Sequence, residues 1–270
     1  MAAGAGGGGE SSMVSSEQQN ISDFWWLTSE EAVKYKYIYF CHQEPYSDEP
    51  NSKKDPKSVS RFLSVDEEGN LSSSTKYYPL NFINFWRKRC ANINIFRSFG
   101  LSSSECDDEK LFGPFLIDID REEREVDKGY MQNLDEALED TRRIVSEYLY
   151  GFKKEDFRIF FTGHKGFNVE VCPQALDVVH INGRLQQFKR ILKDINRLFI
   201  SGKDRQFVDK IHCEVRLHNS INRWIANDGK IKNRMKFELS LHELNNVTAE
   251  EVCRKSEKLA LNYLSTKRAV

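Results

Sequence analysis

The stretch Leu116-Ile117-Asp118-Ile119-Asp120 lies between Gly113-Pro114 and the charged run Arg121-Glu122-Glu123. An apolar run that alternates with carboxylates predicts a β-strand, and the side-chain period of two puts Asp118 and Asp120 on one face. Neighbouring carboxylates repel each other, and a divalent cation relieves the repulsion. Such oxygen ligands suit Mg²⁺ or Mn²⁺, which in pairs drive in-line phosphoryl transfer. For this motif taken alone, the alternative is an acid pair that faces water at the end of a strand.

Two later segments supply partners for such a site. From Phe157 the sequence FRIFFTGHKGFNVEVCP has two apolar, aromatic-rich runs around a glycine-containing turn, which predicts a β-hairpin. From Ile211 the sequence IHCEVRLHNSINRW predicts a strand with Val215 and Leu217 inward and Arg216 outward, followed by a polar turn. The order is therefore an acid pair, a basic glycine-rich turn, and an arginine with a Ser/Asn turn.

This order resembles the three motifs of the archaeo-eukaryotic primase superfamily, which includes the small catalytic subunit of replicative primases and PrimPol-type polymerases. Residues 113–120 resemble the first motif, whose two acids hold the catalytic metals. Residues 162–168 resemble the second, usually Ser-Gly-x-basic-Gly-x-His, in which the basic residue lies near the incoming nucleotide. The resemblance implies that the nucleotide-binding residues of this segment are Thr162, Gly163, His164, Lys165, Gly166 and Asn168.

Asn168 stands where the family has a histidine that contacts nucleotide phosphate. An amide can still donate a hydrogen bond, but it cannot carry positive charge. The substitution therefore predicts weaker triphosphate binding or an altered substrate.

Residues 216–222, RLHNSIN, resemble the third region, typically Arg-Leu-Pro-Gly-Ser-Leu-His or a variant that ends in Asn. His218 and Asn219 replace the usual Pro-Gly. The resemblance implies phosphate contacts by this region, and the residues implied are Arg216, Ser220 and Asn222, with Arg223 as a weaker candidate.

The third metal-binding acid of the family lies upstream of the arginine of this third region. Asp204 has the family's spacing from Arg216, whereas Asp209 follows the apolar pair Phe207-Val208 and has the local pattern. Both acids remain candidates for the third ligand, with Asp204 slightly favoured.

The periodicity of the chain predicts an α+β fold. Helices are expected at 81–89, 134–149, 186–199 and 248–263, and further strands at 92–98 and 234–241. Thr248 followed by Glu251 predicts a capping box at the last helix. The resemblance implies a primase-type catalytic core, with an antiparallel sheet like that of an RNA-recognition motif backed by helices. The expected divisions are a disordered tail at 1–20, an N-terminal α/β extension at 21–90 with a mobile loop near 43–58, and a catalytic domain at 91–265.

Composition predicts a soluble, intracellular protein that does not enter a membrane. Of its 270 residues 39% are apolar, no run approaches the ~20 apolar residues of a membrane span, and the Gly/Ser-rich start lacks the regions of a secretory signal. Six scattered cysteines without a Cys-x-x-Cys pair predict neither a zinc site nor a disulfide framework.

The formal net charge is −1, but residues 184–236 hold fourteen Lys/Arg against five acids, and residues 105–127 hold ten acids against three bases. A basic segment that faces the acidic, metal-binding segment would suit phosphate binding, because the cations and the basic surface meet the phosphates from opposite sides.

The resemblance implies a DNA-directed primase or polymerase, a nucleotidyltransferase that makes or extends short primers by two-metal-ion phosphoryl transfer. Asp118, Asp120 and a third acid are the expected ligands of two Mg²⁺ or Mn²⁺ ions. The expected partners are a single-stranded DNA template and an NTP or dNTP, with an accessory primase subunit or a helicase as a further partner.

Two alternative functions stay open. One is a degenerate relative that binds nucleic acid or nucleotide without polymerising, which Asn168 favours. The other is an unrelated metal-dependent phosphohydrolase. The chain contains no GxxxxGK[ST] sequence, which excludes a P-loop helicase or kinase.

Overall fold

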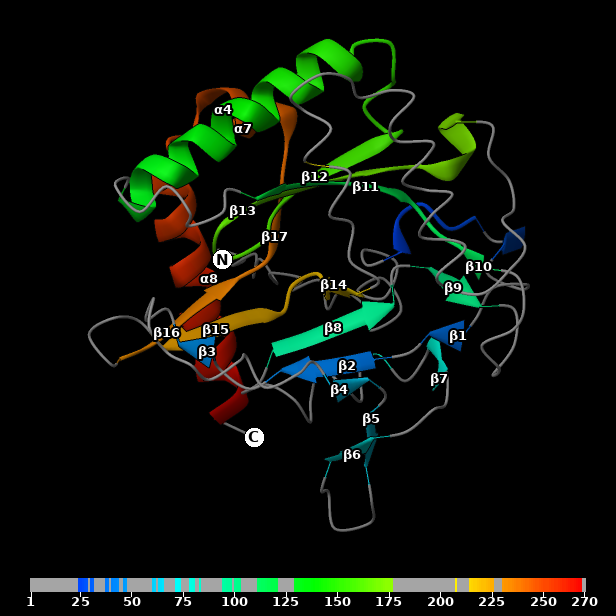
Figure 1. The fold of residues 1–270 in the computed structure, drawn as a ribbon, viewed down its shortest axis with the longest axis vertical. Helices are drawn as coiled ribbons and strands as arrows, with labels where there is room; N and C mark the ends of the chain where they lie inside the picture. Colours follow the sequence, from blue (N-terminus) through cyan, green and yellow to red (C-terminus); the bar gives the residue numbers. More distant parts are fainter. Residues whose placement is uncertain are drawn as a thin grey trace, which may run out of the picture.

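The computed structural model describes part of the chain. The described residues are 24–28, 30–31, 37–38, 40–43, 46–47, 60–61, 63–65, 71–73, 78–80, 83, 94–98, 100–102, 111–120, 129–176, 207, 214–225 and 230–268. The expected tail at 1–20, the helix expected at 186–199, and Asp204 and Asp209 lie outside these ranges, as do all of 81–89 except Ile83 and most of 43–58. Within them the chain has the predicted α+β fold with mainly antiparallel sheets (Figure 1).

One four-stranded antiparallel sheet carries the acid motif and the hairpin. Its strands, in spatial order, are β11 (Phe115–Asp120), β13 (Gly166–Val171), β12 (Phe157–Phe161) and β17 (Phe237–Leu239). The acid strand and the β12–β13 hairpin are thus confirmed. The register pairs Asp118 with Asn168 and Asp120 with Gly166, which brings the first two motifs together.

Helices pack against the outer side of this sheet, and the last of them continues beyond it and packs against Ile221 and Met235 (Figure 1). They are α4 (Tyr130–Tyr148), α7 (Leu241–Asn246) and α8 (Ala249–Arg268), and a 3₁₀ helix, η3 (Pro173–Leu176), follows β13. Apolar residues of α4 and α8 such as Leu134 and Val252 pack in one core with Ile117 and Val169 of the sheet. The capping box at α8 is confirmed, since the Thr248 N–H donates to Glu251 Oε2 at 2.8 Å and the Glu251 N–H donates to Thr248 Oγ1 at 3.3 Å.

A second sheet contains the strand predicted at 92–98, and its residues Phe96 and Arg216 line a cavity together with residues of the first sheet. Its order is β14 (Glu214–Arg216), β8 (Asn94–Ser98), β2 (Phe40–Gln43) and β4 (Ser60–Arg61). A third sheet has the order β16 (Ile231–Met235), β15 (Ile221–Ile225) and β3 (Tyr46–Ser47). The remaining short strands are β1 (Tyr37–Ile38), β5 (Leu63–Val65), β6 (Leu71–Ser73), β7 (Tyr78–Pro79), β9 (Leu101–Ser102) and β10 (Leu111–Phe112).

Two predicted boundaries were wrong. The strand expected at 234–241 is divided at Lys236, whose backbone N–H donates to the Ser220 carbonyl at 3.0 Å, and Leu241 begins α7. The polar turn expected to include Asn222 and Arg223 ends at Ser220, because those two residues pair with β16 as part of β15. Asn219 makes the turn with a φ of 52°, a conformation that asparagine tolerates well.

None of the helices in the described part of the chain is long and apolar enough to cross a membrane.

Gly166→Ala should destabilise the fold, because Gly166 lies against the acid strand. A Cβ at Gly166 would lie 2.0 Å from the Ile119 carbonyl oxygen, so β11 and β13 would have to separate beside Asp120. We expect the free energy of unfolding, measured by urea denaturation, to fall by about 2 kcal/mol or more. Gly151→Ala is the matched control, since nothing lies within 4 Å of its added Cβ. Equal urea midpoints for the two variants would contradict the close approach of β11 and β13.

Candidate functional site

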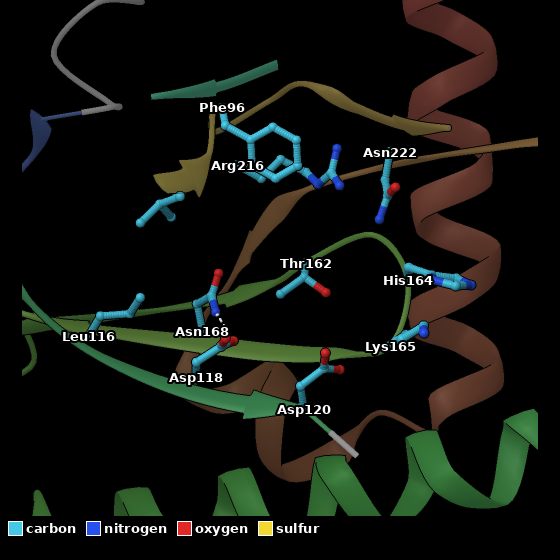
Figure 2. Close-up of a pocket in the computed structure, with 11 residues that line it drawn as sticks. Phe96, Leu116, Asp118, Asp120, Thr162, His164, Lys165, Asn168, Arg216 and Asn222 are labelled. Atoms are coloured by element: carbon cyan, nitrogen blue, oxygen red, sulfur yellow. Dashed lines mark hydrogen bonds between the residues drawn. The ribbon is translucent and has the colours of Figure 1, made fainter. Parts of the chain in front are cut away.

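A cavity of about 170 Å³ lies where the end of β11, the β12–β13 turn, β8 and the β14–β15 segment meet (Figure 2). It brings together residues from all three motifs. Its lining consists of Phe96, Leu116, Asp118, Asp120, Thr162, His164, Lys165, Asn168, Val215, Arg216 and Asn222. The motifs predicted the polar members of this set, whereas Phe96, Leu116 and Val215 had not been singled out as site residues.

The acid wall of the cavity is formed by Asp118 and Asp120, whose side chains project from the same face of β11 (Figure 2). The Asn168 amide nitrogen donates a 2.6 Å hydrogen bond to Asp118 Oδ1. Burial raises the pKa of Asp118 to about 6, although Lys236 and Asn168 act in the opposite direction. Asp118 is therefore a carboxylate at neutral pH, in an environment that disfavours its charge.

The opposite wall carries Arg216, whose guanidinium carbon lies 4.5 Å from the centre of the Phe96 ring. Its Nη1 donates to Asn94 Oδ1 at 3.1 Å and to the Ile221 carbonyl at 3.3 Å. The buried Asn94 side chain also accepts the Arg223 N–H at 2.6 Å and donates to the Arg223 carbonyl at 2.9 Å. Asn94 thus joins β8 to β15 and holds Arg216 in place.

The β12–β13 turn supplies the third side of the cavity through Thr162, His164 and Lys165. The buried His164 ring packs between Tyr130 and Trp224, with centroid distances of 5.7 and 4.3 Å. The Tyr130 hydroxyl donates to the His164 carbonyl at 2.6 Å. Because this packing orients the histidine, the turn that presents Lys165 to the cavity is itself held in place.

A buried charge cluster lies behind the cavity and is centred on Glu170, which is 0% exposed. Its Oε1 lies 2.8 Å from His218 Nε2 and 3.7 Å from both Arg97 Nη2 and Lys236 Nζ, and its Oε2 accepts from Trp25 Nε1 at 3.2 Å. Burial alone would raise the pKa of Glu170, but His218, Lys236 and Arg97 together hold it well below its usual range. We call Glu170, Arg97, His218 and Lys236 the Glu170 cluster.

Lys236 links this cluster to both walls of the cavity. Its Nζ donates to Asn168 Oδ1 at 3.2 Å and to the Arg216 carbonyl at 3.2 Å. Burial lowers the pKa of Lys236 to about 8, which still leaves an ammonium group at neutral pH. The residue types and spacing of the motifs had not singled out Lys236. The sequence placed it only at the end of the basic segment 184–236 and within a segment predicted to be a strand.

The remaining predicted residues have other places. Ser220 is buried and donates from its hydroxyl to the Leu217 carbonyl at 2.6 Å, and Arg223 lies on β15 outside the cavity lining. Gly163 has a φ of 88°, and an added Cβ would lie 3.1 Å from Asn222 Cβ, so this position requires glycine. Gly166 allows the close approach of β13 to the acid strand.

No group of three or more His, Cys, Asp or Glu residues with the spacing of a metal site occurs in the part of the chain that the structure describes. Asp118 and Asp120 therefore form a pair there, and Asp204 and Asp209 lie outside the described residues. One further acid has a described backbone position: Glu214 begins β14 two positions before Arg216, opposite Ser98 of β8. Since residues two apart in a strand share a face, positions 214 and 216 belong to the same face of β14.

The donor set of the cavity fits a hard divalent cation together with an anionic ligand. Carboxylate oxygens are the ligands that Mg²⁺ and Mn²⁺ prefer, and two of them share one wall. The guanidinium of Arg216 and the ammonium of Lys165 are suited to phosphate oxygens. The cavity can therefore hold a cation between the acids and a phosphate chain against the basic residues.

No family model matches the sequence, and no curated protein is detectably similar to it.

Without divalent cations, Asp118→Asn should raise the free energy of unfolding at about pH 8 by about 1–2 kcal/mol. The folded pKa of Asp118, about 6, exceeds the ordinary value of 3.8, so the folded state binds this proton more tightly than the unfolded chain does. Stability is lost as the pH rises through this interval, whereas asparagine cannot ionise. Guanidinium denaturation should therefore show a gain that shrinks toward about pH 4.

The exposed Asp120 provides the matched control, and Asp120→Asn should change stability by less than about 0.5 kcal/mol at either pH. A variant Asp118→Asn that is no more stable than the parent at the higher pH would contradict a carboxylate disfavoured by burial.

Proposed function

We propose that the cavity is the active site of a metal-dependent nucleotidyltransferase of the primase type, which makes or extends primers on single-stranded DNA. The observation that carries this proposal is the position of Asp118 and Asp120 on one wall of a cavity whose other walls present Arg216 and Lys165. A phosphoryl-transfer site needs cation ligands and phosphate ligands within one small space.

The connectivity of the main sheet supports a primase-type core. The order β11-α4-β12-β13, with β13 between β11 and β12, is the arrangement of the first three strands and first helix of a ferredoxin-like or RNA-recognition-motif fold. The fourth strand, β17, lies beside β12 instead of at the other edge. The core proposed here is therefore a variant of that fold.

In the proposed mechanism Asp118 and Asp120 would hold Mg²⁺ or Mn²⁺. Two such ions would lower the pKa of an attacking 3′-hydroxyl and bind the triphosphate of the incoming nucleotide. Arg216 and Lys165 would contact phosphate oxygens and stabilise the charge that develops on the leaving group. Phe96 and Asn94 fix the Arg216 guanidinium before a ligand arrives, so little reorganisation is needed.

Three acids are candidates for the third metal ligand in this proposal. Asp204 and Asp209 come from the resemblance, and Glu214 comes from its strand position two residues before Arg216. Side-chain variants of all three distinguish them, since only the loss of the actual third ligand should weaken Mn²⁺ binding and so reduce activity.

The proposed partners are a single-stranded DNA template and an NTP or dNTP, with an accessory primase subunit or a helicase as the protein partner. Support for a nucleic-acid surface near the cavity comes from the β15–β16 hairpin, which contributes Asn222 to the lining. Lys230 and Lys232 are exposed beside or on this hairpin, and such side chains attract the DNA backbone.

A second candidate function, nucleotide or nucleic-acid binding without polymerisation, is favoured by Asn168. Both ends of its amide have protein partners, Asp118 and Lys236. Because an amide is neutral and both of its ends already have protein partners, residue 168 cannot supply the positive charge that the family histidine brings to a triphosphate.

The two candidate functions are separated by a primer-synthesis assay with single-stranded DNA, labelled NTP or dNTP, and Mg²⁺ or Mn²⁺. We expect extended products from the parent, and a loss of about 100-fold or more in Asp118→Ala and Asp120→Ala, because each removes transition-state charge stabilisation. Asp135→Ala, at an exposed position of α4, is the matched control and should retain activity.

Products made equally well by both cavity variants would contradict the proposal. Nucleotide or DNA binding by fluorescence anisotropy, without any product, would select the second candidate. In the same assay Asp204→Asn, Asp209→Asn and Glu214→Gln should identify the third acid as the one whose change reduces activity as strongly as Asp118→Ala.

A further inference from the structure

We propose that Lys236 is a positioning residue of the cavity: its ammonium holds the Asn168 amide in the one orientation that donates to Asp118. Asp118 is thereby kept in a fixed position on the acid wall. The consequence for catalysis rests on the proposed function, whereas the orientation of the amide does not.

The position of the Lys236 ammonium is fixed from several strands. Its side chain is 0% exposed, and Nζ lies 3.2 Å from Asn168 Oδ1, 3.2 Å from the Arg216 carbonyl and 3.7 Å from Glu170 Oε1. The Phe160 ring centre is 5.0 Å away. An ammonium has three N–H donors. Asn168 Oδ1 and the Arg216 carbonyl each accept a hydrogen bond from Lys236 Nζ, and Glu170 is an ion-pair partner at longer range.

The position of the Lys236 ammonium determines which way the Asn168 side-chain amide is turned. An asparagine side chain can turn over at little cost unless its neighbours distinguish oxygen from nitrogen. Lys236 is only a donor, so it requires Asn168 Oδ1 on its side, and Asn168 Nδ2 then lies 2.6 Å from Asp118 Oδ1. The reversed amide would set N–H groups against the ammonium and a carbonyl oxygen against the carboxylate.

Charge balance of the Glu170 cluster does not by itself require Lys236. Glu170 already has Arg97 as an ion-pair partner, together with His218 at 2.8 Å and the Trp25 indole at 3.2 Å. Burying a further ammonium costs free energy, as the lowered pKa of Lys236 indicates. A role at the cavity accounts for this cost, since Lys236 contacts both Asn168 and the backbone of Arg216.

A double-mutant cycle tests whether Lys236 acts through Asn168. Lys236→Met should lower kcat for primer extension about tenfold in the parent, with a change in nucleotide KM below about twofold. In an Asn168→Ala background the same change should cost less than about twofold, because no amide remains to be oriented. Lys258→Met, at an exposed lysine of α8, is the matched control and should leave kcat within about twofold. Equal losses in both backgrounds would overturn the proposal.

NMR of the Asn168 side-chain amide provides a measurement independent of activity. The signal, assigned by its disappearance in Asn168→Ala, should show two well-separated protons with slowed hydrogen exchange in the parent. Both features should be lost in Lys236→Met and kept in Lys258→Met. An unchanged signal in a folded Lys236→Met protein would overturn the proposal.

If Lys236→Met does not fold, the Asn168 amide signal of the parent protein is used to test the proposal. A rapidly exchanging, freely turning Asn168 amide would overturn the proposal, and a protected one would support it. A parent protein that shows the protected amide but synthesises no primer would contradict the proposed function without contradicting the orientation of Asn168 by Lys236.

Discussion

The buried carboxylate of Glu170 is the interaction on which the walls of the cavity depend. It lies on β13, two residues after Asn168, and its partners come from β8, from the turn after β14 and from the link between β16 and β17. Glu170 therefore joins the sheet that carries the acids to the segments that carry Arg216. Removing one partner of a buried ion pair commonly costs about 3–5 kcal/mol, so this cluster constrains the relative position of the two walls strongly.

This constraint explains how the cavity can keep the carboxylate of Asp118 and the guanidinium of Arg216 on separate walls without a direct ion pair between them. Asp118 is satisfied by Asn168, and Arg216 by Asn94 and the Ile221 carbonyl, so each charge has a neutral partner on its own wall. Neither neutral partner cancels the charge that it contacts. In the proposed site a cation and a phosphate chain would bind between the walls. The raised pKa of Asp118 reflects the burial of its carboxylate.

Local periodicity was sufficient to predict the elements that carry the site. The strand period of two puts Asp118 and Asp120 on one face, the glycine turn sets the β12–β13 hairpin, and Thr248 with Glu251 caps α8. The Glu170 cluster could not be predicted in this way. Arg97 and Glu170 are far apart in the sequence, and a glutamate within an apolar strand gives no indication of which residue it pairs with. The same holds for Asn94, whose contacts with Arg216 and Arg223 exist only after β8 and β15 meet.

The errors in prediction have the same origin. Asn222 and Arg223 are polar, so the pattern favoured a turn, but pairing with β16 makes them part of a strand. Tertiary pairing overrides local preference where a neighbouring strand supplies the hydrogen bonds.

The most direct test of the central claim is anomalous X-ray diffraction from crystals of the protein with Mn²⁺ and a non-hydrolysable nucleoside triphosphate. The account predicts a manganese peak about 2.1 Å from carboxylate oxygens of both Asp118 and Asp120, with phosphate oxygens against Arg216 and Lys165. A cavity that stays free of manganese at saturating Mn²⁺, or a nucleotide bound away from Arg216, would contradict it.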